Sequence, residues 1–559
     1  MIAQLFNGQS KTITSAAVVI GASSLASRFL GVIRDRLLVE HFTVGPTLDA
    51  YYAAFQIPNL LFNFLVLGTL SVAVLPVLMD LLNARDRYQA NRLLSSVFTW
   101  AAIIMGIMCL AIAIFARPLM QIVGPGFNDE TLEVSIRLTR IMVLSPLFFS
   151  LSSVLSTALN ATKRFVVVSV APLLYNCCII LGIVVFSRFL GIYGVAVGVV
   201  LGALVHMSIQ WPAVRHVGFY IRPHTDPNNP HLRNVLKLFL PRVIGIDVSQ
   251  VSLFVGSIAG SMLASGSVAL YNLANNIQSV PIGIFAIPFA VAAFPSFSSA
   301  IAEDNKERFI GLFSHTVRQI IFFLVPLTFF TLVLRAHIIR LIIGTRELSW
   351  DDTRMASAML AIFAVGFIFQ GIAPVLSRAF YATKNTVVPV VVSVYSMIVN
   401  VLAVVGLSVL FSHSVFVTDV INRVLRLDGI SDIRALALPM AFTLAVTMHC
   451  NVLWWMLSCR LGSMDERGIE RALTKILFAS FLSSLAIKGT LALMVPLNLL
   501  HTFLGVLGQF IVAGIVGAAT YIMLALLMKS PEMWAFLSTL HRQMLKITGP
   551  VAVQEVEDL

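Results

Sequence analysis

The chain has 559 residues, of which 58% are hydrophobic and only 11% carry a charge. Soluble globular proteins carry about 25% charged residues, so this composition excludes a soluble domain and indicates a polytopic membrane protein. The net charge of +12 is assigned to loops beside the membrane, because no basic run is interleaved with aromatic residues as nucleic-acid binding requires.

Apolar stretches of about twenty residues predict roughly fourteen membrane-spanning helices. In chain order they cover residues 13–42, 48–82, 93–116, 132–158, 166–186, 193–211, 240–263, 268–300, 312–334, 355–380, 387–411, 435–457, 476–495 and 503–528. In the sixth, Gly194, Gly198 and Gly202 have the small-xxx-small spacing of closely packed helices.

The distribution of cations between the loops predicts the topology. The N-terminal stretch continues past any plausible cleavage point, so it is interpreted as a retained first helix. Alternate loops are rich in lysine and arginine, with exceptions at 335–354 and 418–434. Because cytoplasmic loops carry the excess of cations, we expect both termini in the cytoplasm and an even number of helices.

The first predicted helix is unusual because Arg28 and Arg34 lie within it, beside Asp35 and Arg36. A charge near the bilayer centre costs about 2.5–3.5 kcal/mol on insertion scales, so it usually faces a bundle interior or a watery cavity. Arg36 and Arg34 could instead extend to the headgroup layer, which is harder for the deeper Arg28. We therefore predict a cationic cavity beside this helix.

Two acidic residues have alternative interpretations. Asp49 opens the second helix, where it either favours the positive end of the helix dipole or forms an ion pair with Arg28 or Arg34. Asp247 lies inside the seventh helix and is either a site for cation coupling, a salt-bridge switch, or a hydrogen-bonded structural acid. The sequence leaves both choices open.

An internal repeat predicts the domain organisation. Residues 155–163 resemble residues 376–384, and each copy joins the end of one helix to the start of the next. Six helices separate the copies, so we predict an all-α fold of two six-helix lobes in pseudo-two-fold arrangement, followed by two C-terminal helices. The predicted segments are 1–214, a linker at 215–238, 239–460, the helix pair 461–528 and a cytoplasmic tail at 529–559.

Signatures of enzymes are absent from the sequence. It contains no HExxH, GxxxxGKS/T or GxSxG motif and no cluster of metal ligands. The five cysteines form no CxxC pair, which argues against a zinc site or a disulfide framework. We therefore expect no enzymatic activity, catalytic residue, metal site or cofactor.

Several short motifs occur together between about residues 15 and 527. They are Ser27-Arg28, Gly31, Arg34-Asp35, Asp49-Ala50, Pro58-Asn59-Leu60-Leu61, Pro125-Gly126-Phe127, Leu159-Asn160, Arg164-Phe165, Ala171-Pro172, Asn176, Ser249-Gln250 and the stretch 264–268. As a set they resemble the MurJ/MviN family of lipid II flippases, in the multidrug/oligosaccharidyl-lipid/polysaccharide exporter superfamily. The resemblance implies a V-shaped cationic cavity between two lobes and a C-terminal groove for a lipid tail.

The resemblance also implies a substrate and its contacts. The substrate would be lipid II, an undecaprenyl-pyrophosphate-linked peptidoglycan precursor, moved from the inner to the outer leaflet of the bacterial cytoplasmic membrane by alternating access. By position, Arg28, Arg34 and Asp49 carry over as cavity residues. The other expected cavity residues are Asn59, Arg242, Asn275 and Asn276.

This chain departs from the family pattern in its cavity charges. Phe62, Asn63 and Leu67 stand where the family often has arginines and an acid, and Asn275 and Asn276 replace an Asp-Arg pair. A flippase for another lipid-linked glycan is therefore an alternative, as is a cation-coupled small-molecule antiporter of the same superfamily; a non-transporting scaffold is a third.

The predicted partners are lipid II, membrane lipids and a monovalent cation, without nucleic acid. For the cation, Asp247 and Asn400 are the candidate ligands.

Overall fold

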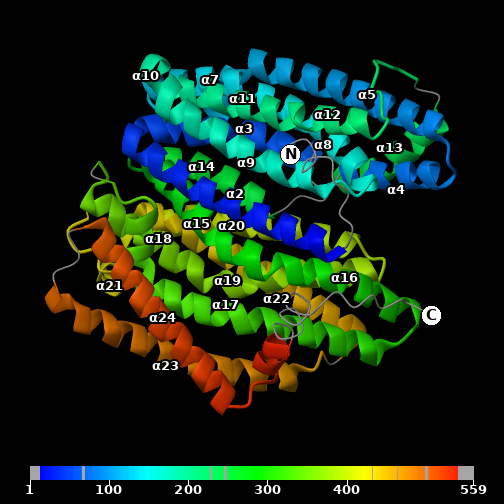
Figure 1. Ribbon diagram of the computed structural model, residues 1–559. Helices are drawn as coiled ribbons and strands as arrows, with labels where there is room; N and C mark the ends of the chain where they lie inside the picture. Colours follow the sequence, from blue (N-terminus) through cyan, green and yellow to red (C-terminus); the bar gives the residue numbers. More distant parts are fainter. Residues whose placement is uncertain are drawn as a thin grey trace. The chain divides into compact units, whose positions relative to one another are not determined.

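A computed structural model describes residues 13–65, 70–226, 229–243, 248–345, 347–430, 432–462, 464–497 and 502–538. Within these ranges the regular secondary structure is helical, without strands (Figure 1). Ten of the described helices are long and apolar enough to cross a membrane. Two further helices, bent by 43° at Gly366, are together long and apolar enough to form either a broken span or a re-entrant loop.

The described residues divide into two compact units. The first unit comprises Met1–Ile277, Ile342–Met359 and Val390–Ala445. Its helices, with those that continue into the second unit, are α2 (Ile13–Phe42), α3 (Pro46–Leu65), α4 (Leu70–Asn83), α5 (Arg87–Ile114), α6 (Ala116–Val123), α7 (Asp129–Met142), α8 (Leu144–Ala161), α9 (Phe165–Leu181), η1 (Gly182–Phe186), α10 (Ser187–Leu190), α11 (Ile192–Ser208), α12 (Gln210–His216), α13 (Pro230–Val243), α14 (Val248–Ser261), α15 (Ser267–Phe285), α18 (Trp350–Val365), α20 (Val387–His413), α21 (Val415–Leu425), η2 (Arg434–Leu436) and α22 (Ala437–Leu461).

The second unit comprises Gln278–Leu341, Leu360–Pro389 and Val446–Leu559. It contains the remainders of α15, α18, α20 and α22. Its other helices are α16 (Ile287–Ala302), α17 (Lys306–Ile342), α19 (Phe367–Ala382), α23 (Glu466–Met494), η3 (Val495–Leu497) and α24 (Phe503–Leu527). The last two long helices, α23 and α24, lie side by side (Figure 1).

Every predicted span coincides with a helix or with two consecutive helices. The spans that do not count among the ten long apolar helices are α2, the α3–α4 pair, α14 and the bent α18–α19 pair. The all-helical, multi-pass fold is therefore confirmed. The exact count of fourteen spans and the proposed lobe boundaries remain predictions.

Glycines allow α11 to pack closely on α9, as their spacing predicts (Figure 1). A Cβ atom added at Gly198 would lie 2.9 Å from the Cα atom of Gly182 and 2.8 Å from the carbonyl oxygen of Cys178. One added at Gly202 would lie 2.8 Å from the ring of Tyr175. Any side chain here would push the two helices apart, so these glycines have a packing role.

A tyrosine compensates for the proline that interrupts α17. Pro326 has no N–H, so the carbonyl of Phe322, four residues earlier, loses its usual helical donor. The hydroxyl of Tyr521, on α24, donates a hydrogen bond of 2.8 Å to that carbonyl oxygen. The Tyr521 and Phe322 rings also lie 5.4 Å apart, centroid to centroid. This bond attaches α24 to α17 at the position where the proline leaves an acceptor unsatisfied.

We expect Tyr521→Phe to lower the free energy of unfolding by about 1–3 kcal/mol, because it leaves a buried carbonyl without a donor where lipid cannot replace it. Thermal unfolding of the purified protein measures the change, with Tyr220→Phe, at an exposed tyrosine, as the matched control. In a Pro326→Ala background residue 326 regains its N–H, so the cost of Tyr521→Phe should shrink. An equal cost in both backgrounds would contradict this account.

Candidate functional site

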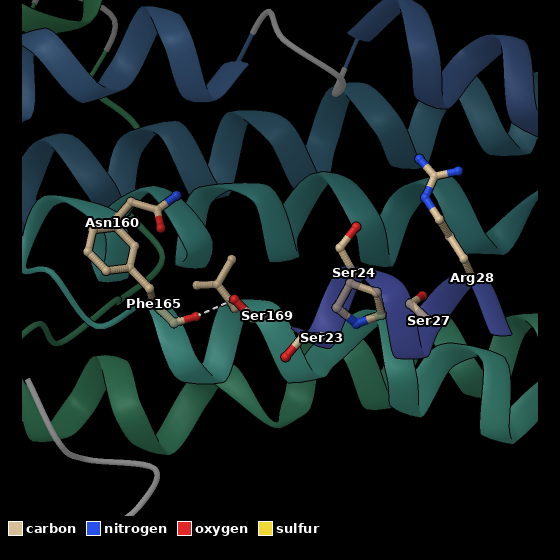
Figure 2. A pocket seen from close by; sticks show the side chains of 9 residues that line it. Ser23, Ser24, Ser27, Arg28, Asn160, Phe165 and Ser169 are labelled. Carbon is tan, nitrogen blue, oxygen red and sulfur yellow. Dashed lines mark hydrogen bonds between the residues drawn. The ribbon is translucent and has the colours of Figure 1, made fainter. Parts of the chain in front are cut away.

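A polar pocket of about 500 Å³ lies within the first unit, beside the charged stretch of α2. Figure 2 shows Arg28 at one end and Asn160 and Phe165 at the other. The pocket is lined by Ser23, Ser24, Ser27 and Arg28 of α2, Asn160 of α8, and Phe165, Val168, Ser169 and Pro172 of α9. Four serines, an amide and a guanidinium in one pocket provide hydrogen-bond donors for an anionic, hydroxyl-rich molecule.

The pocket lies beside the middle of α2 and the start of α9. Arg28 is fifteen residues after Ile13, the first residue of α2, which is about 22 Å along the helix. The α9 residues that line the pocket belong to its first two turns, directly after the Lys163-Arg164 loop.

Arg28 and Arg34 have different surroundings although both belong to α2. Among the described residues, the guanidinium of Arg28 has no hydrogen bond or ion pair, and it is half-buried at the edge of the pocket. Arg34 donates two hydrogen bonds to Oδ1 of Asp35, from Nε at 2.9 Å and from Nη2 at 2.7 Å. The charge of Arg34 is therefore balanced within the protein, whereas that of Arg28 faces the pocket.

The Arg34–Asp35 pair belongs to a polar network that joins three helices. Nη1 of Arg34 lies 3.5 Å from Oδ1 of Asn176 on α9, and Asn176 donates to Oγ of Ser27 at 3.1 Å. The second carboxylate oxygen of Asp35 accepts a bond of 3.1 Å from the amide of Asn276 on α15. The carboxylate side chain is only 7% exposed and that of Arg34 only 23%, so the network is shielded from solvent.

Asp49 occupies the first turn of α3, as predicted, but its carboxylate binds the N-terminus of a different helix. Oδ2 accepts a hydrogen bond of 2.6 Å from the backbone N–H of Gly266, and Oδ1 one of 2.7 Å from that of Ala269. These N–H groups begin α15, where the helix dipole favours a negative charge. No ion pair joins Asp49 to Arg28 or Arg34 in the described part of the chain. The contact with the start of α15 is one that neither interpretation specified.

We expect Asp49→Asn to lower the free energy of unfolding by about 1.5–3 kcal/mol, because an amide offers one acceptor oxygen to two buried N–H donors. The readout is the melting temperature of the purified protein, compared with that of Asp80→Asn at an exposed position on α4. Unchanged stability in Asp49→Asn would show that the carboxylate is not needed at the start of α15.

A row of amides continues this contact along α3. Nε2 of Gln56 donates to Oδ1 of Asn272 on α15 at 3.2 Å. Asn59 and Asn63 both donate to Oε1 of Gln250 on α14, at 3.1 Å and 2.7 Å. Asn59 and Asn63 therefore both bind a residue of another helix, and Asn63 makes the shorter bond. Uncharged amides join these helices here without a buried charge that needs a partner.

None of the other predicted site residues whose side chains the structure describes belongs to the pocket lining. Asn275 and Asn276 are half-buried on α15, with Asn276 bound to Asp35. Arg242 belongs to α13, but its side chain is outside the described residues, and Asp247 is outside them altogether. Asn400, on α20, is 2% exposed, and its side-chain oxygen has no hydrogen-bond partner in the described part of the chain.

Sequence reasoning missed the other residues of the pocket wall. Ser23, Ser24 and Ser169 carry no charge and belong to no motif that signals chemistry. Their spacing offered one signal, because residues 20, 23, 24, 27 and 28 share one face of a helix, and three of these are serines. That this face meets α9 could not be read from the sequence.

Comparisons with known proteins place these features in a family context. The family model described as "Lipid II flippase MurJ" matches residues 38–508. A probable lipid II flippase MurJ of Buchnera aphidicola subsp. Acyrthosiphon pisum is 28% identical over 401 residues, covering 71% of this chain and 78% of the relative. A probable lipid II flippase MurJ of Vibrio cholerae is 24% identical over 488 residues, covering 83% of this chain and 93% of the relative.

Solved structures show the same fold at lower identity. Lipid II flippase MurJ in an inward closed conformation superposes with a TM-score of 0.70 at 20% identity, covering 91% of this chain and 98% of that structure. An inward-facing MATE family transporter of the MOP superfamily superposes with a TM-score of 0.60 at 15% identity, covering 78% and 96%. Both are membrane transporters with the helical architecture described above.

Proposed function

The chain belongs to the lipid II flippase MurJ family, and on this premise we propose that it moves lipid II from the inner to the outer leaflet of the bacterial cytoplasmic membrane by alternating access. It is a transporter that supplies a peptidoglycan precursor for cell-wall synthesis, with both termini in the cytoplasm. Lipid II combines a pyrophosphate, a disaccharide-peptide headgroup and a long lipid tail, so its binding site needs both cations and hydrogen-bond donors.

One observation supports this assignment most directly: Arg28 faces a polar pocket without a carboxylate partner in the described residues. A guanidinium presents a planar fork of donors that matches a phosphate group and forms charge-assisted hydrogen bonds with it. Ser23, Ser24 and Ser27 continue along the same wall, where their hydroxyls could bond further phosphate or sugar oxygens. We propose that Arg28 binds the pyrophosphate and that the serines bind the adjoining polar groups of the substrate.

The other predicted cavity residues take supporting roles in this proposal. Arg34 is balanced by Asp35, and Asp49 is bound to the start of α15, so neither is a free charge for the substrate in this conformation. They hold α2, α9 and α15 beside the pocket. Arg34 would contact substrate only in a state where the pair with Asp35 has opened. Asn59, Arg242 and Asn275 stay proposed as cavity residues.

A different lipid-linked glycan is the second candidate, because Asn63 and Asn276 replace charges of the family pattern and here bond Gln250 and Asp35. The pyrophosphate chemistry at Arg28 would be unchanged, and only the sugar and peptide would differ. For coupling we propose a monovalent cation at Asp247 and Asn400. The side-chain oxygen of Asn400 is buried and has no hydrogen-bond partner among the described residues, which supports an electropositive ligand there.

The test is replacement of the resident flippase. The chain is expressed in bacteria whose own lipid II flippase can be shut off, its membrane level is confirmed, and lipid II exposed on the outer leaflet is quantified. Restored exposure supports the proposal. A normal membrane level without lipid II exposure overturns it, and the lipid-linked glycan that accumulates when the gene is removed from its own host would then identify the substrate.

A further inference from the structure

The two ends of the pocket beside α2 offer different hydrogen-bonding groups to a ligand. At one end lies Arg28, whose guanidinium carries only N–H donors (Figure 2). Next to it, Ser27 accepts a hydrogen bond of 3.1 Å from Nδ2 of Asn176. The hydroxyl proton of Ser27 is not donated to any described residue, so it stays available to a ligand. This end of the pocket therefore presents donors, which suit the oxygens of a phosphate group.

The opposite end of the pocket also presents acceptors. Ser169 donates its hydroxyl proton to the carbonyl oxygen of Phe165 at 2.9 Å, so in this conformation its oxygen offers only lone pairs to a ligand (Figure 2). The side-chain amide of Asn160 has no hydrogen-bond partner among the described residues, and it offers an accepting oxygen as well as two N–H donors. An ionised pyrophosphate has acceptors alone, so it leaves both of these oxygens without a partner. A hydroxyl group or an amide satisfies them.

An aromatic side chain completes this end of the pocket. Phe165 is the first residue of α9, and it lines the pocket together with Asn160, which lies near the end of α8 (Figure 2). The face of an aromatic ring is apolar and electron-rich, so it attracts C–H groups with their slightly positive hydrogens. A sugar ring has C–H groups on its faces and hydroxyls at its edge. Asn160, Phe165 and Ser169 therefore combine the polar and the apolar contacts that a sugar needs.

We propose that Asn160, Phe165 and Ser169 form a sugar subsite, which binds the sugar joined to the pyrophosphate while Arg28 binds the pyrophosphate itself. This inference rests on the proposed function, which supplies the identity of the lipid. The pocket volume of about 500 Å³ is that of a site for a drug-sized ligand, so it holds only part of a disaccharide-peptide headgroup. The peptide is attached through the sugar and so lies farther from the pyrophosphate. The peptide therefore stays outside the pocket.

Binding of three lipids to the purified full chain tests the sugar subsite. The first is undecaprenyl pyrophosphate, which has no sugar. The second carries the disaccharide without the peptide, and the third is lipid II. The dissociation constant of each lipid is measured by native mass spectrometry in detergent solution. We expect the second and third to bind with similar affinity, and both to bind about tenfold more tightly than undecaprenyl pyrophosphate, because they add hydrogen bonds in the subsite.

Four variants separate the two ends of the pocket. Asn160→Leu keeps the approximate size of the side chain and loses its hydrogen-bonding groups, so it should weaken binding of both sugar-bearing lipids about tenfold and leave undecaprenyl pyrophosphate unaffected. Ser169→Ala should act in the same direction with a smaller effect. Arg28→Ala should weaken binding of all three lipids. Asn451→Leu, at an exposed asparagine of α22, is the matched control and should leave all three dissociation constants unchanged.

The outcomes distinguish failure of the sugar subsite from failure of the proposed function. The subsite is wrong, and the proposed function stands, if the wild type binds all three lipids equally or if Asn160→Leu and Ser169→Ala each weaken all three equally. Tighter binding of lipid II alone, without a gain from the disaccharide, would assign these residues to the peptide and overturn the sugar subsite. If the wild type binds none of the three lipids, the proposed function is overturned together with the subsite.

Discussion

Replacement of Arg28 by alanine is expected to abolish exposure of lipid II on the outer leaflet while the protein still reaches the membrane. Among the described residues, Arg28 lines the pocket and has no ion-pair partner, so its charge is uncompensated. A hydrogen bond to a charged group contributes about 1.5–3 kcal/mol. Loss of one such bond lowers affinity about 10–100-fold, and loss of the bidentate pair lowers it further. The measurement is lipid II exposure in flippase-depleted bacteria.

Two further variants separate charge, geometry and general effects. Arg28→Lys keeps the charge but loses the planar fork, so intermediate exposure is expected. Arg188→Ala removes an exposed arginine at the end of α10 and should leave exposure unchanged. Wild-type exposure in Arg28→Ala at a normal membrane level would remove Arg28 from the binding site and with it the role assigned to the pocket.

Replacement of Asp35 by alanine is expected to lower the free energy of unfolding by about 3–5 kcal/mol, the largest stability effect that we predict. The side chains of Arg34 and Asp35 are 23% and 7% exposed, so removal of the carboxylate leaves the guanidinium in a shielded site. Among the described residues, its remaining hydrogen-bond acceptor would be Oδ1 of Asn176, at 3.5 Å. The protein should unfold at a lower temperature and accumulate less in the membrane.

The matched controls use the same chemistry in other settings. In the double variant Arg34→Met with Asp35→Leu no charge is left unpaired, so most of the lost stability should return. Glu133→Ala breaks a pair with Arg117 whose side chains are 44% and 57% exposed, and its effect should be below about 1 kcal/mol. Equal losses of stability in Asp35→Ala and Glu133→Ala would disprove the structural role of the Arg34–Asp35 pair.

The outcome for α2 shows how far sequence reasoning reaches within one helix. The cost of charge in a bilayer predicts that both Arg28 and Arg34 need a polar environment, and both have one. It does not distinguish an arginine that faces a pocket from one whose charge is balanced. The pair with Asp35 was not evident, since adjacent residues on a helix point in different directions, and here a long side chain bridges them.

The sequence by itself determined the class of protein, the positions of the helices and the family. These follow from hydropathy, from the length needed to cross a bilayer, and from motifs, which are all local properties of the chain. Glycine spacing likewise predicted the close packing of α11, because the absence of side chains is itself a local property.

Only the tertiary structure decided which groups meet. Asp49 binds the N–H groups of Gly266 and Ala269, and Tyr521 binds the carbonyl that Pro326 leaves without a donor. These partners are far apart in the sequence. Hydrogen bonds require distances near 3 Å and suitable angles, so a polar residue's partner depends on how its helix is rotated and placed against the next one. Residue type and spacing indicate that a buried polar group needs a hydrogen-bond partner. The packing of the helices determines which group that partner is.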